Sequence, residues 1–168
     1  IVLGTIASDT GVAGANDITV TATAGAITVN TSVTSDDTVS LTANTTINDN
    51  AADDVADVLG SAVTLSAQTG IGTTSSFDVD VVTVTSATTV TGGIALNLLD
   101  ADNGGVTVTA ADASTSGAIT LTATSGSGTK TYTSVDTNNG NISLTATAGN
   151  IVLGTIASDT GVAGANDI

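Results

Sequence analysis

Seven common side chains are missing from this 168-residue chain, which contains no His, Cys, Met, Trp, Pro, Glu or Arg. Without Cys it has neither disulfide bridges nor thiolate metal sites. Without His, only aspartate can act as a general base. Without Arg, Lys130 is the only basic side chain that can stabilise an anionic transition state. We therefore expect a protein that is not an enzyme.

Aromatic residues are almost absent too, since the chain has one Phe (Phe77) and one Tyr (Tyr132). A globular β-sandwich of this size normally builds its core on several large aromatic side chains. An interior of Ile, Val, Leu and Ala has to be narrow and has to repeat along an axis. The lack of Pro fits a continuous sheet, because each Pro removes one hydrogen bond from the ladder.

The charge is almost entirely of one sign, with sixteen Asp residues and a formal net charge of −15. Aspartate suits turns, because its short side chain can bond its own backbone. So acidic a surface excludes nucleic acid as a partner, and no apolar run is long enough to span a membrane. We expect exposed aspartates at corners and loops, with no cofactor and no metal required for folding.

Repetition is the strongest feature that the chain does have. Residues 1–18 read IVLGTIASDTGVAGANDI, and residues 151–168 read the same. Long self-similarity marks arrays, solenoids and fibres. We interpret 1–150 as one complete repeat of a continuous solenoid and 151–168 as the start of the next, in a window of a longer protein. The second copy is expected to take the same place on its coil as the first.

A shorter phrase of alternating apolar and hydroxyl residues returns within the repeat. Alternation of this kind with β-branched residues is the signal of a half-buried strand. Seven starts divide the 150 residues into steps with a mean near 21, at Ile18, Val39, Val63, Val82, Val106, Ile119 and Ile142. We predict that Ile18, Val39, Val63, Val82 and Ile142 stack in one column.

Weaker second strands follow several of these starts after a small-residue corner, as Ile27 follows Ile18 across Ala24 and Gly25. Strand, corner, strand and return in about 21 residues describe one coil, so the fold class is an all-β parallel solenoid of about seven coils. The 13-residue step from Val106 to Ile119 is too short for a coil, which favours a coil that begins at Ile94 and contains Val106. Residues 50–60 predict a short helix or a bulging loop at one corner.

The phrase Gly140-Asn-Ile-Ser-Leu-Thr-Ala-Thr-Ala-Gly-Asn-Ile-Val-Leu-Gly154 resembles the coils of filamentous-haemagglutinin-like exoproteins and related giant bacterial surface adhesins. The resemblance covers most of the chain and implies a parallel β-helix, export across a bacterial envelope, and an extracellular or cell-surface role as a stalk. It gives no binding residue. Both ends carry the same phrase without a distinct cap, so we expect the partner to be the protein's own chain, end to end or as continuing repeats, and the adhesion ligand stays open.

Three alternatives remain at this point. Asp100 and Asp102 resemble the opening of a calcium loop, although Gly104 stands where a third ligand belongs and the chain has no Glu. Hard oxygen ligands are also offered by the aspartates at 49, 53, 54, 57, 78 and 80. Acidic, Thr-rich identical repeats also occur in calcium-stabilised immunoglobulin-like extender domains. Frequent Thr-x-Thr phrases are compatible with ice or glycan binding along a rod, or with threonine as a good outward-facing strand residue.

Overall fold

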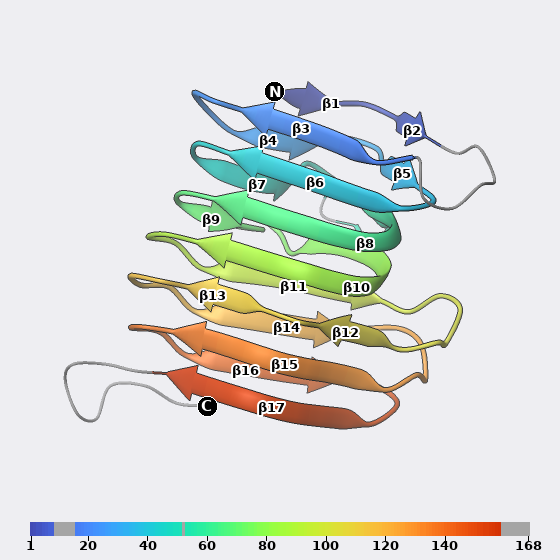
Figure 1. Ribbon diagram of the computed structural model, residues 1–168, viewed down its shortest axis with the longest axis vertical. Helices are drawn as coiled ribbons and strands as arrows, with labels where there is room; N and C mark the ends of the chain where they lie inside the picture. The colour runs from blue at the N-terminus through green and yellow to red at the C-terminus, as the bar shows by residue number, and fades with distance from the viewer. Residues whose placement is uncertain (9–15, 52, 159–168) are drawn as a thin grey trace.

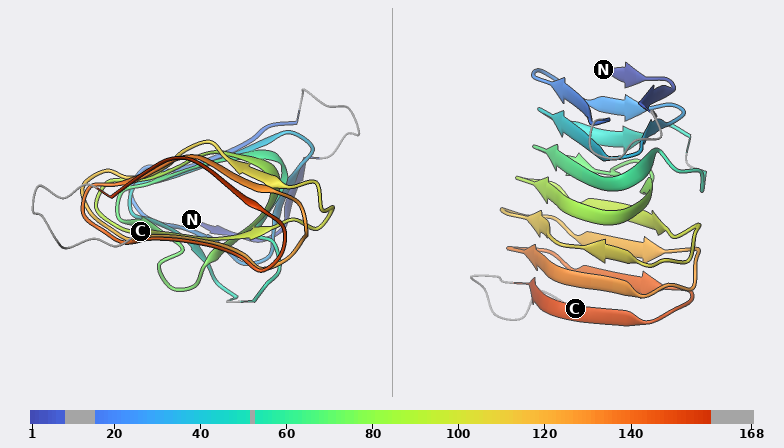
Figure 2. Two further views of the ribbon diagram at one scale, coloured as in Figure 1. Left: turned by 90° about the horizontal axis from the view of Figure 1, so that it is seen from below. Right: turned by 45° about the vertical axis from the view of Figure 1, so that its right-hand side comes forward.

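The chain winds into an all-β parallel solenoid in the computed structural model, which describes residues 1–8, 16–51 and 53–158 (Figure 1). Its coils stack along one axis, and the section across that axis is a flattened ring with two broad faces (Figure 2). About six turns are present, close to the seven expected. Every strand pairing among the described residues is parallel, which excludes an antiparallel immunoglobulin-like sandwich.

Strands of successive coils stack on two broad faces. Face A consists of β3 (Ile18–Ala22), β6 (Thr38–Ala43), β8 (Val58–Ala67), β10 (Phe77–Thr89), β12 (Val106–Val108), β13 (Ala111–Ala113), β15 (Lys130–Thr137) and β17 (Ile151–Ser158). One coil contributes two short strands, β12 and β13, to this face. Face B consists of β1 (Val2–Leu3), β4 (Ile27–Val29), β7 (Thr46–Asp49), β9 (Gly70–Ile71), β11 (Ile94–Leu99), β14 (Ile119–Ala123) and β16 (Ile142–Ala146). The short strand β2 (Ile6–Ser8) pairs with β5 (Val33–Ser35), and β5 pairs with the first residues of β8. The first residues of β8 pair with the first residues of β10, which also pair with the end of β11.

Aliphatic columns fill the space between the faces. On face B one column is made only of isoleucine, all six members at most 4% exposed: Ile27, Ile47, Ile71, Ile94, Ile119 and Ile142. On face A the matching column reads Ile18, Val39, Val63, Val84, Val108, Tyr132 and Leu153. Burying one such aliphatic side chain stabilises the fold by about 1.5–3 kcal/mol, so the stacked columns supply most of the stability.

Two members of the predicted column were assigned wrongly. Ile142 lies on face B in the isoleucine column, because the 13-residue step from Val106 to Ile119 joins the two faces of one coil. Val82 is 58% exposed and points outward where β10 bends between its two paired segments, so Val84 takes the inward position beside Val63. Ile94 does pair with Ile119, as a coil containing Val106 requires.

The coil is longer than the sequence indicates. Five coil steps carry the isoleucine column over the 115 residues from Ile27 to Ile142, a mean of 23 residues for each coil. The predicted mean near 21 was too short because it counted Val106 and Ile119 as separate coils. A 150-residue repeat at 23 residues for each coil contains about six and a half coils.

That half coil places the two copies of the repeated segment on different faces. Val2 pairs with Thr28 on face B, whereas Val152 pairs with Thr131 on face A. The prediction that both copies take the same place on a coil was therefore wrong for residues 1–8 and 151–158; the remaining residues of the second copy lie outside the described part.

The possible helix near residues 50–60 is absent from the described part of this segment. Residues 50–57, apart from residue 52, form a bulging loop, and β8 begins at Val58. Hydrogen bonds fix this loop: the Ala51 amide donates to Asp49 Oδ1 at 2.7 Å, and the Val55 amide donates to Asp53 Oδ1 at 3.0 Å. Aspartate side chains that bond the backbone two residues on favour turns over helix, which explains the loop.

Glycine is required where the coils turn from face A to face B. Gly117 has φ of +131°, and a Cβ placed on it would lie 2.4 Å from the carbonyl carbon of Gly92 in the coil before. A Cβ on Gly140, in the coil after, would lie 2.2 Å from the Gly117 carbonyl oxygen. Backbones therefore touch directly at this corner, which keeps the coils in register.

Candidate functional site

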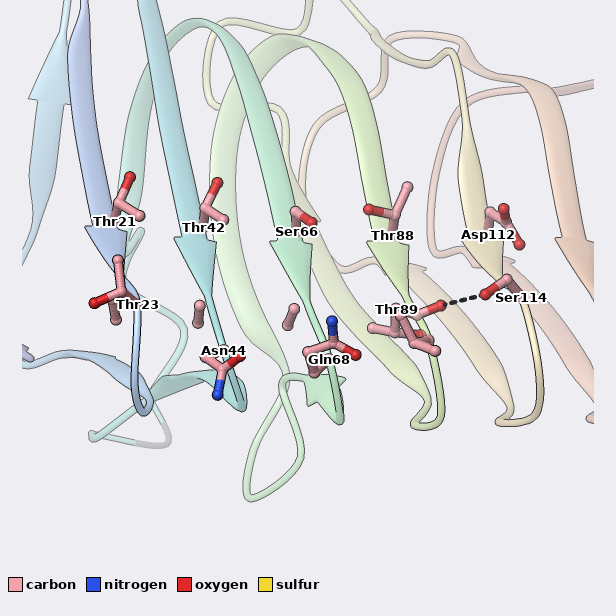
Figure 3. A pocket seen from close by; sticks show the side chains of 14 residues that line it. Thr21, Thr23, Thr42, Asn44, Ser66, Gln68, Thr88, Thr89, Asp112 and Ser114 are labelled. Atoms are coloured by element: carbon pink, nitrogen blue, oxygen red, sulfur yellow. Dashed lines mark hydrogen bonds between the residues drawn. The ribbon is translucent and has the colours of Figure 1, made fainter.

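A row of short polar side chains runs across the outside of face A. The row is in register from coil to coil and consists of Thr21, Thr42, Ser66, Thr88 and Asp112 (Figure 3). It borders an open groove of about 400 Å³ that also includes Asn44 and Gln68. Parallel strands place successive residues of the row about 4.8 Å apart. The face therefore presents a regular ladder of hydroxyl groups, followed by the carboxylates of Asp112 and Asp136.

The sequence-predicted calcium candidates occupy two different environments. Asp100 is 2% exposed, and its Oδ2 lies 2.9 Å from Lys130 Nζ in a buried ion pair. Asp102 is exposed, and its Oδ1 accepts a hydrogen bond from the Gly104 amide at 2.9 Å. Lys130 thus pairs with Asp100, and calcium at this loop stays a prediction.

Donors surround the Asp100 carboxylate. Its Oδ1 accepts from the Gly105 amide at 2.9 Å, and its Oδ2 accepts from the Gly128 amide at 3.0 Å as well as from Lys130. The Lys130 ammonium also donates to the carbonyl oxygens of Gly126 and Gly128, both at 2.9 Å. Burial opposes ionisation of Asp100, but these donors outweigh burial and hold its pKa below the ordinary value.

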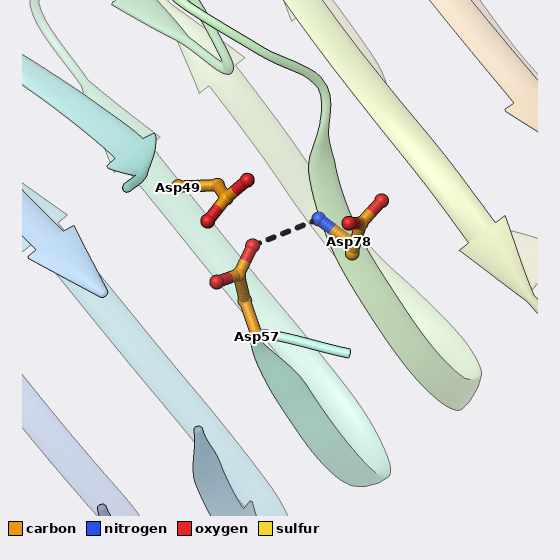
Figure 4. A group of neighbouring side chains, drawn as sticks. All are labelled: Asp49, Asp57 and Asp78. Atoms are coloured by element: carbon orange, nitrogen blue, oxygen red, sulfur yellow. Dashed lines mark hydrogen bonds between the residues drawn. The ribbon is translucent and has the colours of Figure 1, made fainter. Parts of the chain in front are cut away.

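Three other aspartates gather at the bulging loop. Asp49 ends β7, Asp57 precedes β8 and Asp78 is the second residue of β10, and each is at most 5% exposed (Figure 4). One carboxylate oxygen from each lies within 4.8 Å of the other two. We call these three residues the aspartate cluster.

Local structure explains how the cluster forms. Asp49 is in register with Val29 and Leu3 of the preceding coils, so a carboxylate stands where those coils place an aliphatic side chain. Asp57 and Asp78 belong to adjacent coils: the Asp57 amide donates to the Asp78 carbonyl at 2.9 Å, and the Asp78 amide donates to Asp57 Oδ2 at 3.0 Å. The strand ladder itself therefore holds two acids side by side.

The ionisation of the cluster is strongly shifted. Burial, followed by the charges of Asp49 and Asp78, raises the pKa of Asp57 to about 8. Burial raises the pKa of Asp78 to about 6, helped by the charges of Asp49 and Asp54 and opposed by a hydrogen bond from the Asn97 side chain. Carboxylates so close together cannot all ionise without a compensating charge, and the described residues place none there.

A cavity of about 230 Å³ adjoins the cluster at Asp78. The bulging loop contributes Asp53 and Asp54 to it, and the neighbouring coils contribute Ser75, Ser76, Asn97, Thr122 and Thr124. Asn97 Nδ2 donates to Asp54 Oδ1 at 3.4 Å, and Thr124 Oγ1 donates to Asn97 Oδ1 at 2.8 Å. The lining offers oxygen atoms and one amide, which suits a hard cation better than an anion.

Sequence reasoning recognised the members of the cluster as oxygen donors but did not group them. Asp49 and Asp78 are separated by about one coil plus a loop, and no local motif links them. Their one signal in the sequence is Asp78, which stands between Phe77 and Val79 at the start of a strand that is buried on both sides.

No helix among the residues that the structure describes is long and apolar enough to cross a membrane. Comparison with family models, with curated proteins and with solved structures finds no match to this chain.

Proposed function

We propose that this chain is part of the shaft of a tandem-repeat fibre, extracellular and anchored at a prokaryotic cell surface, of the filamentous-haemagglutinin-like kind. The observation that supports this most directly is the unbroken succession of parallel pairings from β1 to β17, in which the strands of each coil pair with the strands of the next. The role is mechanical and not catalytic, and the main partner is the same chain continued.

Stiffness follows from how the columns and ladders combine. Bending the rod would separate coils on one side, which breaks backbone hydrogen bonds and exposes side chains such as Ile71 and Ile94 that are buried almost completely. No linker interrupts the coils between Asn16 and Ser158 in the described part of the chain. A shaft of this kind gains length simply by copying its repeat.

Apolar side chains are exposed at both ends of the described solenoid. Exposed apolar residues gather on the last strand of face A, where Val152 is 49% and Leu153 is 55% exposed, and Val2 at the other end is 68% exposed. Both copies of the repeated segment therefore present an edge that another coil can cover.

Length measurements on proteins of one, two and three repeats test the proposal. Six and a half coils at about 4.8 Å for each coil add roughly 31 Å to the rod for each repeat. Small-angle scattering and electron microscopy should show rods of constant thickness that lengthen by that step. Flexible strings of beads, or lengths that do not grow in proportion, would contradict a shaft. Immunogold labelling of the producing cell tests the surface location separately.

The hydroxyl row of face A supports a second candidate, a binding surface for glycan or ice displayed along the rod. The observation in its favour is the register of Thr21, Thr42, Ser66 and Thr88 beside a groove. Glycan arrays and ice-recrystallisation assays on the wild-type protein and on Thr42→Val and Thr88→Val variants test it. Equal responses from all three proteins would remove this candidate and leave the shaft proposal untouched.

A further inference from the structure

We propose that the aspartate cluster of Asp49, Asp57 and Asp78 binds one calcium ion, which pins the bulging loop to the shaft. The site is distinct from the Asp100–Asp102 loop, and it adds ligand binding to the mechanical role. Its basis is the meeting of three buried carboxylates within reach of a single ion.

The charges around the aspartate cluster are almost all negative. The chain has one basic side chain, and Lys130 already pairs with Asp100 at 2.9 Å. The amino group of Ile1 donates instead to the Ala26 carbonyl. Asp53 and Asp54 of the loop add further negative charge beside the cluster. Buried carboxylates need a proton or a cation, and the described part of the protein supplies no cation here.

One carboxylate oxygen of the cluster is unsatisfied. The Asp78 side chain is 1% exposed, yet its Oδ2 has no hydrogen-bond partner. The Ala51 amide and the Ser75 hydroxyl donate to Asp49, and the Asp78 amide donates to Asp57. Asn97 stabilises the Asp78 carboxylate through a side-chain hydrogen bond, which leaves Oδ2 unpaired. Leaving a buried carboxylate oxygen without a partner is costly, and a bound cation removes that cost.

The choice of ion follows from the spacing of the ligands. Calcium lies 2.3–2.6 Å from each ligand, so two oxygens that bind it lie up to roughly 5 Å apart, which matches the spread of 4.8 Å in the cluster. Zinc prefers nitrogen and sulfur ligands, and magnesium requires shorter bonds in a stricter octahedron. The adjoining cavity leaves room for the water molecules or loop carboxylates that complete a calcium shell of six to eight oxygens.

Calorimetric titration of the 168-residue protein with calcium, after removal of metal with a chelator, tests the proposal directly. We expect one high-affinity ion for each chain. A calcium concentration one hundred times Kd should raise Tm by about 5 to 10 °C. Magnesium at the same concentration should have a smaller effect.

Two matched variants locate the site. Asp78→Asn keeps the shape of the side chain but removes a charge, so it should abolish calcium binding and raise Tm in the absence of calcium, because repulsion in the cluster is relieved. Asp102→Asn removes an exposed charge from the rival loop and should leave calcium binding unchanged. Binding that survives Asp78→Asn, binding lost in Asp102→Asn, or the absence of stoichiometric binding by the wild-type protein at pH 8 would each overturn the proposal. The wild-type titration stands even where a variant does not fold.

Discussion

Replacing Lys130 by methionine removes the only ammonium group from the interior of the shaft. Methionine keeps most of the length of the side chain, so packing is nearly preserved while the charge is lost. Asp100 then stays buried with only the Gly105 and Gly128 amides as donors. Breaking a buried ion pair by removing one partner costs about 3–5 kcal/mol. In a chain of this length that loss corresponds to a fall in Tm of roughly 10 °C.

Urea unfolding followed by circular dichroism measures the effect as a free energy of unfolding. Asp102→Asn is the matched control, because it removes a charge two residues from Asp100 where no ion pair exists, and it should change stability by less than about 0.5 kcal/mol. The double variant Asp100→Asn with Lys130→Met should recover part of the loss, since no unpaired charge remains. A loss below about 1 kcal/mol in Lys130→Met would refute the assignment of this pair as an essential contact.

The same pair predicts a dependence on pH. The pKa of Asp100 is held below its ordinary value in the folded protein, so the stability that it contributes is present above the unfolded pKa of about 3.9 and is lost as the pH falls through the folded value. The difference in stability between the wild-type protein and Lys130→Met should therefore shrink as the pH falls below about 4. A difference that is constant from pH 7 to pH 3 would contradict the ion pair as its source.

Three further predictions concern other parts of the core. Tyr132→Phe should stabilise the protein by about 1 kcal/mol in urea unfolding, because the buried hydroxyl has no partner, and a destabilised variant would reveal a partner for it. Gly117→Val should cost more than about 2 kcal/mol or prevent folding, because its φ is positive and its Cβ would overlap the Gly92 backbone; wild-type Tm would contradict the corner geometry. In calcium-free buffer, the free energy of unfolding should fall as the pH rises from about 4 to about 8. The raised pKa values of Asp57 and Asp78 let the folded state hold more protons than the unfolded state in that range, and a flat profile would contradict those pKa values.

The strands of this solenoid could be predicted from the sequence more reliably than the faces on which they lie. Each recurring phrase does form a strand, as at Ile18–Ala22 and Ile142–Ala146, because alternation fixes which side chains point inward. Alternation is the same on both faces, however, and nothing in the phrase at Ile142 distinguishes it from the phrase at Ile18. Only the lengths of the intervening loops decide the face, and those lengths vary from coil to coil.

The clusters were harder to predict because stacking creates them. That Lys130 needs an aspartate follows from elementary electrostatics, but its partner Asp100 is 30 residues away and depends on the register of two coils. The grouping of Asp49, Asp57 and Asp78 depends in addition on a loop that the sequence only weakly distinguishes from a helix. Inward or outward orientation is a local property of a strand, whereas contact between coils is a property of the coil lengths.

The placement of the two copies of IVLGTIAS on opposite faces gives a longer chain of such repeats a symmetry of its own. If further copies follow in tandem, neighbouring repeats are related by a half rotation about the rod together with a rise of roughly 31 Å, as in a two-fold screw. The true structural period is then two sequence repeats, about 13 coils. Each loop and each hydroxyl row then appears alternately on one side of the rod and on the other. A single repeated sequence therefore presents the same surface features on both sides.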